Sequence, residues 1–313
     1  MEKTFTGAKW SAHAKTYTSV FGSLTYPWAV DSLQVAHHEI LRKFQHHASE
    51  MPSAPFHFLD VGCGPGALSF EFARRYLSTY TDARVTASDF SDKMLEQLTE
   101  ALENDPTLRP FRAAITPLQA DGMLLASIPN ASVDIIGSNF GCSIFPDRNK
   151  SWAVAHRVLK DDGLLVVTAW SDKSSQMAWF DKLTEIFNAT EGGGEPLKNP
   201  SLVVATDRDR VLKELQAAGF RHVKSYCTTH TIVFDNLGTV VQASMNNPFA
   251  TKFLERLTKE QMEVTLTNLM EKDSQKKAYC GEGSATTDSG GIFVDDECPH
   301  LIPFSAFTIL ARK

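Results

Sequence analysis

Short apolar runs rich in β-branched residues alternate with amphipathic segments through the middle of the chain. A short apolar run bounded by polar residues or glycine predicts a buried strand, whereas apolar positions at helical spacing predict one face of a helix. Strands are expected at 56–61, 83–88, 114–119, 132–138, 163–170, 222–234 and 303–311. Because strands and helices alternate, the pattern predicts an α/β fold with a seven-stranded, mostly parallel sheet and helices on both faces.

Segments between these strands repeat apolar residues at helical spacing. Helices are expected over 67–76, 91–102, 149–159 and 208–218. Ser91 is expected to cap the second helix, because a serine hydroxyl accepts a hydrogen bond from the free N–H groups of the first turn. Gly163 and Gly219 are each expected to turn the chain after a helix, since glycine adopts left-handed backbone angles at little cost.

Other regions depart from this rhythm. Residues 1–55 are largely helical in pattern and rich in aromatic side chains. Residues 171–207 hold one amphipathic helix before a flexible stretch at 191–196, and residues 249–277 fit one or two helices. Residues 281–291 have the polar, glycine-rich composition of a mobile loop.

These regions and the central strands predict the organisation of the chain. We expect one structural domain overall. Its parts are an N-terminal helical lid over 1–55, a central core over 56–170, and the remainder of the sheet with inserted cap helices over 171–313.

The composition, with 42% hydrophobic and 22% charged residues among 313, is that of an ordinary globular protein. No apolar stretch is long enough to span a bilayer, and the first residues lack the apolar core of a signal peptide, so a cytoplasmic location is expected. The net charge of −6, without a Lys/Arg cluster, argues against nucleic acid as a partner. The five cysteines are scattered without metal-ligand spacing, which favours reduced thiols and no metal site. We expect a monomer or homodimer.

The strongest chemical signal is a glycine-rich turn between the first strand and the first helix. Residues 56–66 read FHFLDVGCGPG, with glycines at 62, 64 and 66. Glycine lets the backbone turn tightly and approach a ligand closely, and the following helix presents free N–H groups. Dinucleotide-binding proteins carry a similar turn, but their glycines are spaced differently, and the Asp60 carboxylate would repel a pyrophosphate. Asp60 suits an ammonium group, which favours an amino-acid-bearing nucleoside over NAD.

Two further acids follow the next two strands. Asp89 lies about twenty residues beyond the glycines, where such folds place a ribose, and a carboxylate there accepts both ribose hydroxyls. Asp121 follows the third strand, where its oxygens suit the amino group of an adenine while Met123 packs on the ring. Asp89 could instead cap the helix after it, and acids are common after strands, which leaves a structural role open for Asp121.

Five segments in order make a resemblance specific. They read LDVGCGPG at 59–66, SDFSDKML at 88–95, ADG at 120–122, DIIGSNFG at 134–141 and HRVLKDDG at 156–163. In this series the chain resembles the class I S-adenosylmethionine-dependent methyltransferases, in the style of the small-molecule enzymes of ubiquinone and menaquinone biosynthesis. The resemblance covers residues 10–170 well and the remainder loosely. It implies a Rossmann-like fold, S-adenosylmethionine as cofactor and S-adenosylhomocysteine as its product.

The resemblance also implies which residues hold the cofactor. Asp60 and the three glycines would surround its methionine part, and Asp89 would bind its ribose. Asn139 and Phe140 would lie beside the sulfonium. The full set of expected cofactor residues is Tyr17, Asp60, Gly62, Cys63, Gly64, Gly66, Asp89, Phe90, Met94, Asp121, Gly122, Met123, Asn139 and Phe140.

Several members of this set have a second interpretation. Tyr17 belongs to the aromatic N-terminal segment, which resembles the lid that such enzymes close over the cofactor, and it is the first candidate for a lid contact. Phe90 and Met94 would pack on the adenine, but aromatic and methionine side chains also serve as ordinary core. Cys63 is interpreted as packing within the loop rather than as a nucleophile.

The acceptor pocket is predicted by elimination. The N-terminal aromatics and the segments 171–207 and 249–277 are not used by the sheet and its helices, so we expect them to build it. Their side chains predict a largely apolar pocket for a small planar or hydrophobic acceptor. The expected contacts are Trp10, Tyr26, Trp170, Met177 and Phe180. The sequence identifies no catalytic base. A methyltransferase of protein or RNA, and a non-catalytic or NAD-type nucleotide-binding protein, stay open as alternatives.

Overall fold

A seven-stranded sheet organises the computed structural model, which describes residues 7–51, 53–190, 196–197, 207–247, 250–274 and 300–313. Its strands are β1 His57–Val61, β2 Arg84–Asp89, β3 Ile115–Gln119, β4 Val133–Ser138, β5 Leu159–Trp170, β6 Arg221–Phe234 and β7 His300–Arg312. Their order is β3-β2-β1-β4-β5-β7-β6. The strands β1 to β5 pair in parallel, and β7 runs antiparallel to β5. The predicted fold class is confirmed.

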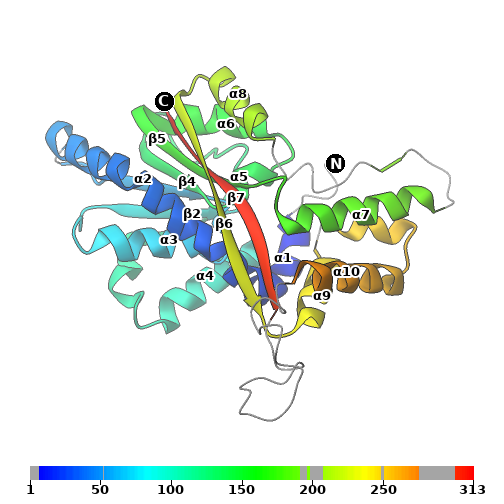
Figure 1. Ribbon diagram of the computed structural model, residues 1–313. Helices are drawn as coiled ribbons and strands as arrows, with labels where there is room; N and C mark the ends of the chain where they lie inside the picture. Colours follow the sequence, from blue (N-terminus) through cyan, green and yellow to red (C-terminus); the bar gives the residue numbers. More distant parts are fainter. Residues whose placement is uncertain (1–6, 52, 191–195, 198–206, 248–249, 275–299) are drawn as a thin grey trace, which may run out of the picture. The chain divides into compact units, whose positions relative to one another are not determined.

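Helices cover both faces of this sheet because the strands place alternate residues on opposite sides. Phe58 and Leu164 belong to the apolar core under α2 Gly22–Glu50, α3 Ala67–Phe72 and α4 Asp92–Asn104. Their neighbours Leu59 and Leu165 belong to the core under α6 Arg148–Val158 and α8 Arg208–Ala217. Figure 1 shows α2, α3 and α4 together on one side and α6 beside α8 on the other.

Shorter turns complete these helices. The π-helical turn η2 Ala73–Leu77 extends α3, so the helix expected over 67–76 ends in a wider turn. The 3₁₀ turn η3 Arg109–Ala114 precedes β3, and α5 Gly141–Ile144 follows β4. Ser91 caps α4 as predicted, because its hydroxyl accepts the Met94 N–H at 3.2 Å.

The N-terminal segment is helical from its first described residue. It consists of α1 Gly7–Thr16, the π-helical turn η1 Tyr17–Phe21 and α2. The α2 helix packs against α3 and β5. No helix in the described part of the chain combines the length and the hydropathy needed to cross a bilayer.

The chain divides into two compact units, a division that differs from the three ranges predicted above. The first comprises the described residues within 1–171, 204–228 and 306–313, and the second those within 172–203 and 229–305. The second contains α7 Ser175–Ala189, α9 Leu237–Met245, η5 Ala250–Glu255 and α10 Lys259–Asp273. The helix expected within 171–207 and those expected within 249–277 are confirmed. The predicted loop at 281–291 and residues 191–195 lie outside the described residues.

The two predicted glycine turns have different outcomes. Gly219 has a φ of 98° and its N–H donates to the Gln216 carbonyl at the end of α8, as expected. Gly163 does not follow a turn, because β5 already begins at Leu159. A Cβ added to Gly163 would lie 2.8 Å from the Lys160 carbonyl oxygen, and Asp162 takes the left-handed φ of 58°. The glycine therefore serves close packing at a strand irregularity, and the prediction of a helix-ending turn was wrong.

Candidate cofactor site

The glycine loop connects β1 to α3 at the carboxyl end of the sheet. Gly62, Gly64 and Gly66 have φ values of 68°, 53° and 103°, a region that side chains of L-residues rarely adopt. The N–H groups of Gly62 and Cys63 both donate to the Ser88 carbonyl, at 2.8 and 2.9 Å. The loop is thus tied to the end of β2 by its own backbone.

The glycines differ in what surrounds them. A Cβ at Gly66 would lie 2.6 Å from the Phe70 ring, so this glycine is required by packing. A Cβ at Gly64 would have only Tyr17 within contact range among the described residues outside its own loop, at 4.0 Å. Gly64 is therefore the position at which a ligand could approach the loop backbone.

Asp89, at the end of β2, holds this loop in shape. Its Oδ2 accepts the N–H of Gly64 and its Oδ1 accepts the N–H of Ser91, both at 2.9 Å. Burial raises the pKa of the carboxyl. The capping role considered for Asp89 belongs to Ser91 instead, while Asp89 joins the glycine loop to the start of α4.

Asp60 is fully buried beneath the loop. The Ser69 hydroxyl donates to its Oδ2 at 2.7 Å, but Oδ1 has no hydrogen-bond partner within the described part of the chain. Burial, reinforced by the negative charge of Asp89, raises the pKa of this carboxyl to about 7. A buried carboxylate oxygen without a donor is costly, so a ligand that brings a donor is favoured here.

The loop after β3 contains Asp121, Gly122 and Met123. The Asp121 Oδ1 accepts the Met123 N–H at 2.8 Å, which shapes a tight turn. A Cβ at Gly122 would lie 2.5 Å from the Phe145 ring, and one at Gly62 would lie 3.5 Å from the same ring. Phe145, which sequence reasoning missed, therefore lies between the two loops.

The end of β4 carries Asn139 and Phe140. The Asn139 amide donates to the Thr25 carbonyl of α2 at 3.2 Å and its oxygen accepts the Thr168 hydroxyl at 2.9 Å. Phe140 has the left-handed φ of 63°, and its N–H donates to the Thr168 hydroxyl oxygen at 2.9 Å. Thr25 and Thr168 were not predicted, because nothing in their local sequence marks them.

An aromatic cluster of Trp28, Phe140 and Trp170 lies at this end of the sheet. The Phe140 ring stacks on Trp170 with centroids 4.1 Å apart, and Trp28 meets Trp170 edge-on at 5.0 Å. All three side chains are buried. Trp170, an expected acceptor contact, is thus adjacent to Phe140, an expected cofactor contact.

The N-terminal segment lies over the glycine loop. The Tyr17 ring lies next to Gly64, and burial, with a smaller contribution from the charge of Asp89, raises the pKa of its phenol. The Ser11 hydroxyl donates to Asp92 at the start of α4 at 2.6 Å. Trp10 and Phe21 flank Tyr17 with ring centroids 6.1 and 6.0 Å away.

The adenine side of the predicted site is assembled from the start of α4. Met94 is buried and Phe90 is half-buried. A Cβ at Gly7 would lie 2.9 Å from the Phe90 carbonyl oxygen, so α1 packs closely on this turn. Cys63 is buried in the apolar core, and burial raises the pKa of its thiol well above the ordinary value, which agrees with a packing role.

Three predicted acceptor contacts, Tyr26, Met177 and Phe180, have other described neighbours. Tyr26 is 38% exposed, and its hydroxyl donates to Glu71 of α3 at 2.8 Å. Met177 and Phe180 are buried in the second unit, where Phe180 stacks on Phe253 of η5. Trp10 and Trp170 belong to the first unit beside Tyr17 and Phe140, whereas Tyr26 bonds α3 and both Met177 and Phe180 belong to the second unit.

The fold and the site together define a class of protein. The strand order reverses between β1 and β4, and ligands of open α/β sheets bind at the carboxyl ends of the strands where such a reversal occurs. The glycine loop, Asp60, Asp89 and Asn139 all lie at this point. The arrangement is that of a nucleotide-type site at the switch point of a doubly wound sheet.

Comparison with known proteins is more specific, since residues 59–167 match the family model described as a methyltransferase domain. The chain is 27% identical over 184 residues to the ubiquinone/menaquinone biosynthesis C-methyltransferase UbiE of Enterobacter sp. strain 638, covering 56% of this chain and 70% of that protein. It is 30% identical over 121 residues to an uncharacterized chloroplastic methyltransferase of Arabidopsis thaliana. That match covers 39% of this chain and spans only 33% of the plant protein.

The fold is similar to that of a solved Bacillus halodurans C-125 protein assigned as a methyltransferase. The TM-score is 0.52 at 18% identity, over 83% of this chain and 94% of that one. The predicted resemblance is therefore confirmed, and residues 59–167 are a domain of the class I S-adenosylmethionine-dependent methyltransferases.

Proposed function

We propose that the protein transfers a methyl group from S-adenosylmethionine to a small, planar or hydrophobic acceptor. The observation that carries the proposal is a left-handed glycine loop held between two buried carboxylates, Asp60 and Asp89. The Asp60 Oδ1 atom has no hydrogen-bond donor among the described residues. A Cβ added at Gly64 would have only the Tyr17 ring nearby in the described part of the chain, at 4.0 Å, so a ligand could approach the loop backbone on that side. These carboxylate acceptors fit the ammonium group of a methionine chain, which donates hydrogen bonds.

The charge of the loop separates this cofactor from a dinucleotide. No Lys, Arg or His among the described residues forms an ion pair with Asp60 or Asp89, whose described partners are hydroxyl and backbone N–H groups. A phosphate about 4 Å from a carboxylate costs on the order of 4 kcal/mol at an effective dielectric constant of 20. A cationic ligand gains a comparable amount, so the site favours a sulfonium nucleoside over NAD.

Residues of this chain would hold the cofactor as follows. The Asp60 carboxylate would take the ammonium group, and Asp89 the ribose hydroxyls. Asp121 and Met123 would meet the adenine, and Asn139 would lie near the sulfonium. The cofactor supplies an already activated methyl carbon, which reacts by in-line displacement.

The protein's own contribution is alignment and exclusion of water. The segment from α1 to η1 covers the glycine loop and is held on α4 by the Ser11–Asp92 and Thr18–Gln97 hydrogen bonds. The half-buried aromatic rings of Trp10 and Tyr17 offer flat apolar faces, which stack well on a planar acceptor. A relative named for ubiquinone and menaquinone biosynthesis supports a small acceptor of this kind. The contribution of Met177 and Phe180 and a cytoplasmic location both stay predictions.

The test compares two left-handed glycines. We expect S-adenosylhomocysteine, and not NAD, to bind the wild type in calorimetry. Gly64→Ala should lose about 1–2 kcal/mol of stability because it places a Cβ at positive φ, and Gly219→Ala should lose at least as much because its Cβ would also lie 2.9 Å from the His156 ring. Only Gly64→Ala should weaken S-adenosylhomocysteine binding, by about tenfold or more, since Gly219 lies at the end of α8.

Two results would contradict the proposal. One is NAD binding that competes with S-adenosylhomocysteine, and the other is a Gly64→Ala variant that binds S-adenosylhomocysteine as the wild type does. The acceptor is then sought by incubating metabolite fractions with a labelled methyl donor. Label that enters only protein or RNA would overturn the small-molecule assignment.

A further inference from the structure

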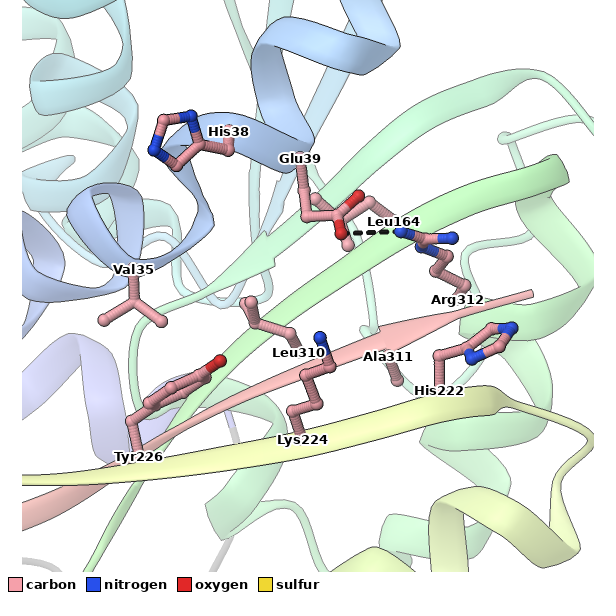
Figure 2. Close-up of a pocket in the computed structure, with 10 residues that line it drawn as sticks. All are labelled: Val35, His38, Glu39, Leu164, His222, Lys224, Tyr226, Leu310, Ala311 and Arg312. Atoms are coloured by element: carbon pink, nitrogen blue, oxygen red, sulfur yellow. Dashed lines mark hydrogen bonds and ion pairs between the residues drawn. The ribbon is translucent and has the colours of Figure 1, made fainter.

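A second pocket lies in the first unit, between α2 and the outer strands β6 and β7 (Figure 2). Its volume is about 280 Å³. The base is apolar, with Leu164 of β5, Leu310 of β7 and Val35 of α2. Polar side chains surround this base, so the pocket offers an apolar floor and a charged rim.

This pocket is separate from the candidate cofactor site. Leu164 pairs with Ile135, near the start of β4, and with Arg312, near the end of the antiparallel β7. The glycine loop and Asn139 instead follow the carboxyl ends of β1 and β4. The pocket therefore lies toward the amino ends of the parallel strands, away from the end that carries the cofactor loops.

Three side chains reach the pocket from one strand. His222, Lys224 and Tyr226 occupy alternate positions of β6, and alternate residues of a strand share a face. Figure 2 shows all three directed from β6 toward α2, where His38 and Glu39 lie. His222 takes the left-handed φ of 50°, a conformation that is uncommon for a residue with a side chain. An ammonium, an imidazole and a phenol thus line one wall.

The charges of the rim are unbalanced. Glu39, the one acid that lines the pocket, accepts hydrogen bonds from Arg312 at 2.6 Å and from Arg42 at 2.9 Å. Although partial burial alone would raise it, these two guanidinium groups hold the pKa of Glu39 below its ordinary value, so its charge is already neutralised. Lys224 forms no ion pair within the described part of the chain. The rim keeps a surplus of positive charge on a chain whose net charge is −6.

We propose that this pocket binds a small organic oxyanion, a phosphate or carboxylate carried on a short apolar body. Lys224 holds the anionic group, with the His222 imidazole two positions away on the same face of β6, and charge-assisted hydrogen bonds to a lysine ammonium are the strong ones. The Tyr226 ring and Leu310 contact the apolar body. A pocket of this volume is at the small end of the range for small-molecule sites, which suits a ligand of low molecular mass.

Inorganic phosphate and citrate are the probes, titrated separately into the full chain by calorimetry at constant ionic strength. Lys224→Gln removes the unpaired ammonium, and Lys213→Gln on α8 is the matched control, since both lysines are exposed. We expect Lys224→Gln to weaken binding of the preferred probe about tenfold and Lys213→Gln to leave it unchanged. S-adenosylhomocysteine binding should be the same in both variants and the wild type.

The two titrations, with phosphate and with citrate, distinguish the two kinds of anionic ligand. Binding of phosphate alone identifies a phosphate ligand, and binding of citrate alone identifies a carboxylate. The proposal is overturned if neither probe binds, or if the two lysine variants weaken binding equally, which would show attraction to bulk charge. Retention of full affinity in Lys224→Gln would likewise overturn it.

Discussion

Asp60 couples proton binding to cofactor binding, which makes its carboxyl the most direct test of the site. Burial raises its pKa from 3.8 to about 7. The folded protein therefore holds this proton in a range where the unfolded chain has lost it. Its contribution to stability is fully present below about pH 4, falls as pH rises, and is gone above about pH 7. At 1.36 kcal/mol for each pH unit, the change is at most roughly 4 kcal/mol.

Cofactor binding should move this proton. If the ammonium of S-adenosylhomocysteine binds the ionised carboxylate, binding must release the proton wherever the free protein still holds it. With a pKa of about 7 in the free protein, affinity should rise about tenfold between pH 6 and pH 8 and level off above. About 0.9 proton should be released at pH 6, because that fraction of the carboxyl is protonated there.

Calorimetry in two buffers of different ionisation enthalpy measures both the affinity and the proton release. Asp60→Asn should bind more weakly and lose the pH dependence, because its amide does not titrate. Asp121→Asn serves as the control and should keep the slope, since Asp121 lies in a different loop. An affinity that is flat from pH 6 to pH 8, or a slope that survives in Asp60→Asn, would refute the role assigned to Asp60.

Three further predictions follow from the contacts described above. Asp89→Ala should lower S-adenosylhomocysteine affinity by at least tenfold in calorimetry while keeping the fold, and Asp89→Asn should be milder; equal binding in wild type and Asp89→Ala would remove the ribose assignment. Deletion of residues 1–21 should weaken cofactor retention and nearly abolish turnover while the core still unfolds in a cooperative urea transition, and unchanged turnover would exclude a lid. His47→Ala should lower the free energy of unfolding in urea by about 2 kcal/mol, because His47 is buried and bonds the Asp134 carboxylate at 2.9 Å. The control His46→Ala changes an exposed residue and should leave that free energy almost unchanged. Equal losses in both variants would mean that the buried contact does not stabilise the fold.

The central strands were predictable because their apolar composition reflects their burial. A strand segment covered on both faces is mostly apolar, and the buried residues 164–167 of β5, which read LLVV, are such a run. The boundary errors occur where local geometry departs from that rule. At Gly163 the sequence favours a turn before the strand, but β5 already begins at Leu159, and its pairing with β4 skips residues 160–163 at an irregularity. The helix α9 was not predicted, since its apolar residues gave no clear boundary signal.

The residues of the candidate site likewise fall into those that local sequence could predict and those that it could not. The glycine loop, Asp60 and Asp89 could be singled out because each stands at the end of an apolar strand that the sequence itself marks. The contacts of Phe145 with Gly122, and of Asn139 with Thr25, join segments far apart in the chain, so no local sequence pattern predicts them. Tyr26 shows the converse, because an aromatic residue expected at the pocket bonds Glu71 of α3 instead.

The indole rings of Trp28 and Trp170, with centroids 5.0 Å apart, have an optical consequence. Two transition dipoles at this separation exchange excitation, so the pair should contribute a couplet to the far-ultraviolet circular dichroism, where the strongest indole transition lies. Trp28 belongs to α2 and Trp170 to the end of β5, and Asn139 bonds α2 beside them. Any displacement of α2 changes the distance and angle between the two dipoles. Movement of this helix during turnover would therefore be visible spectroscopically, without a label.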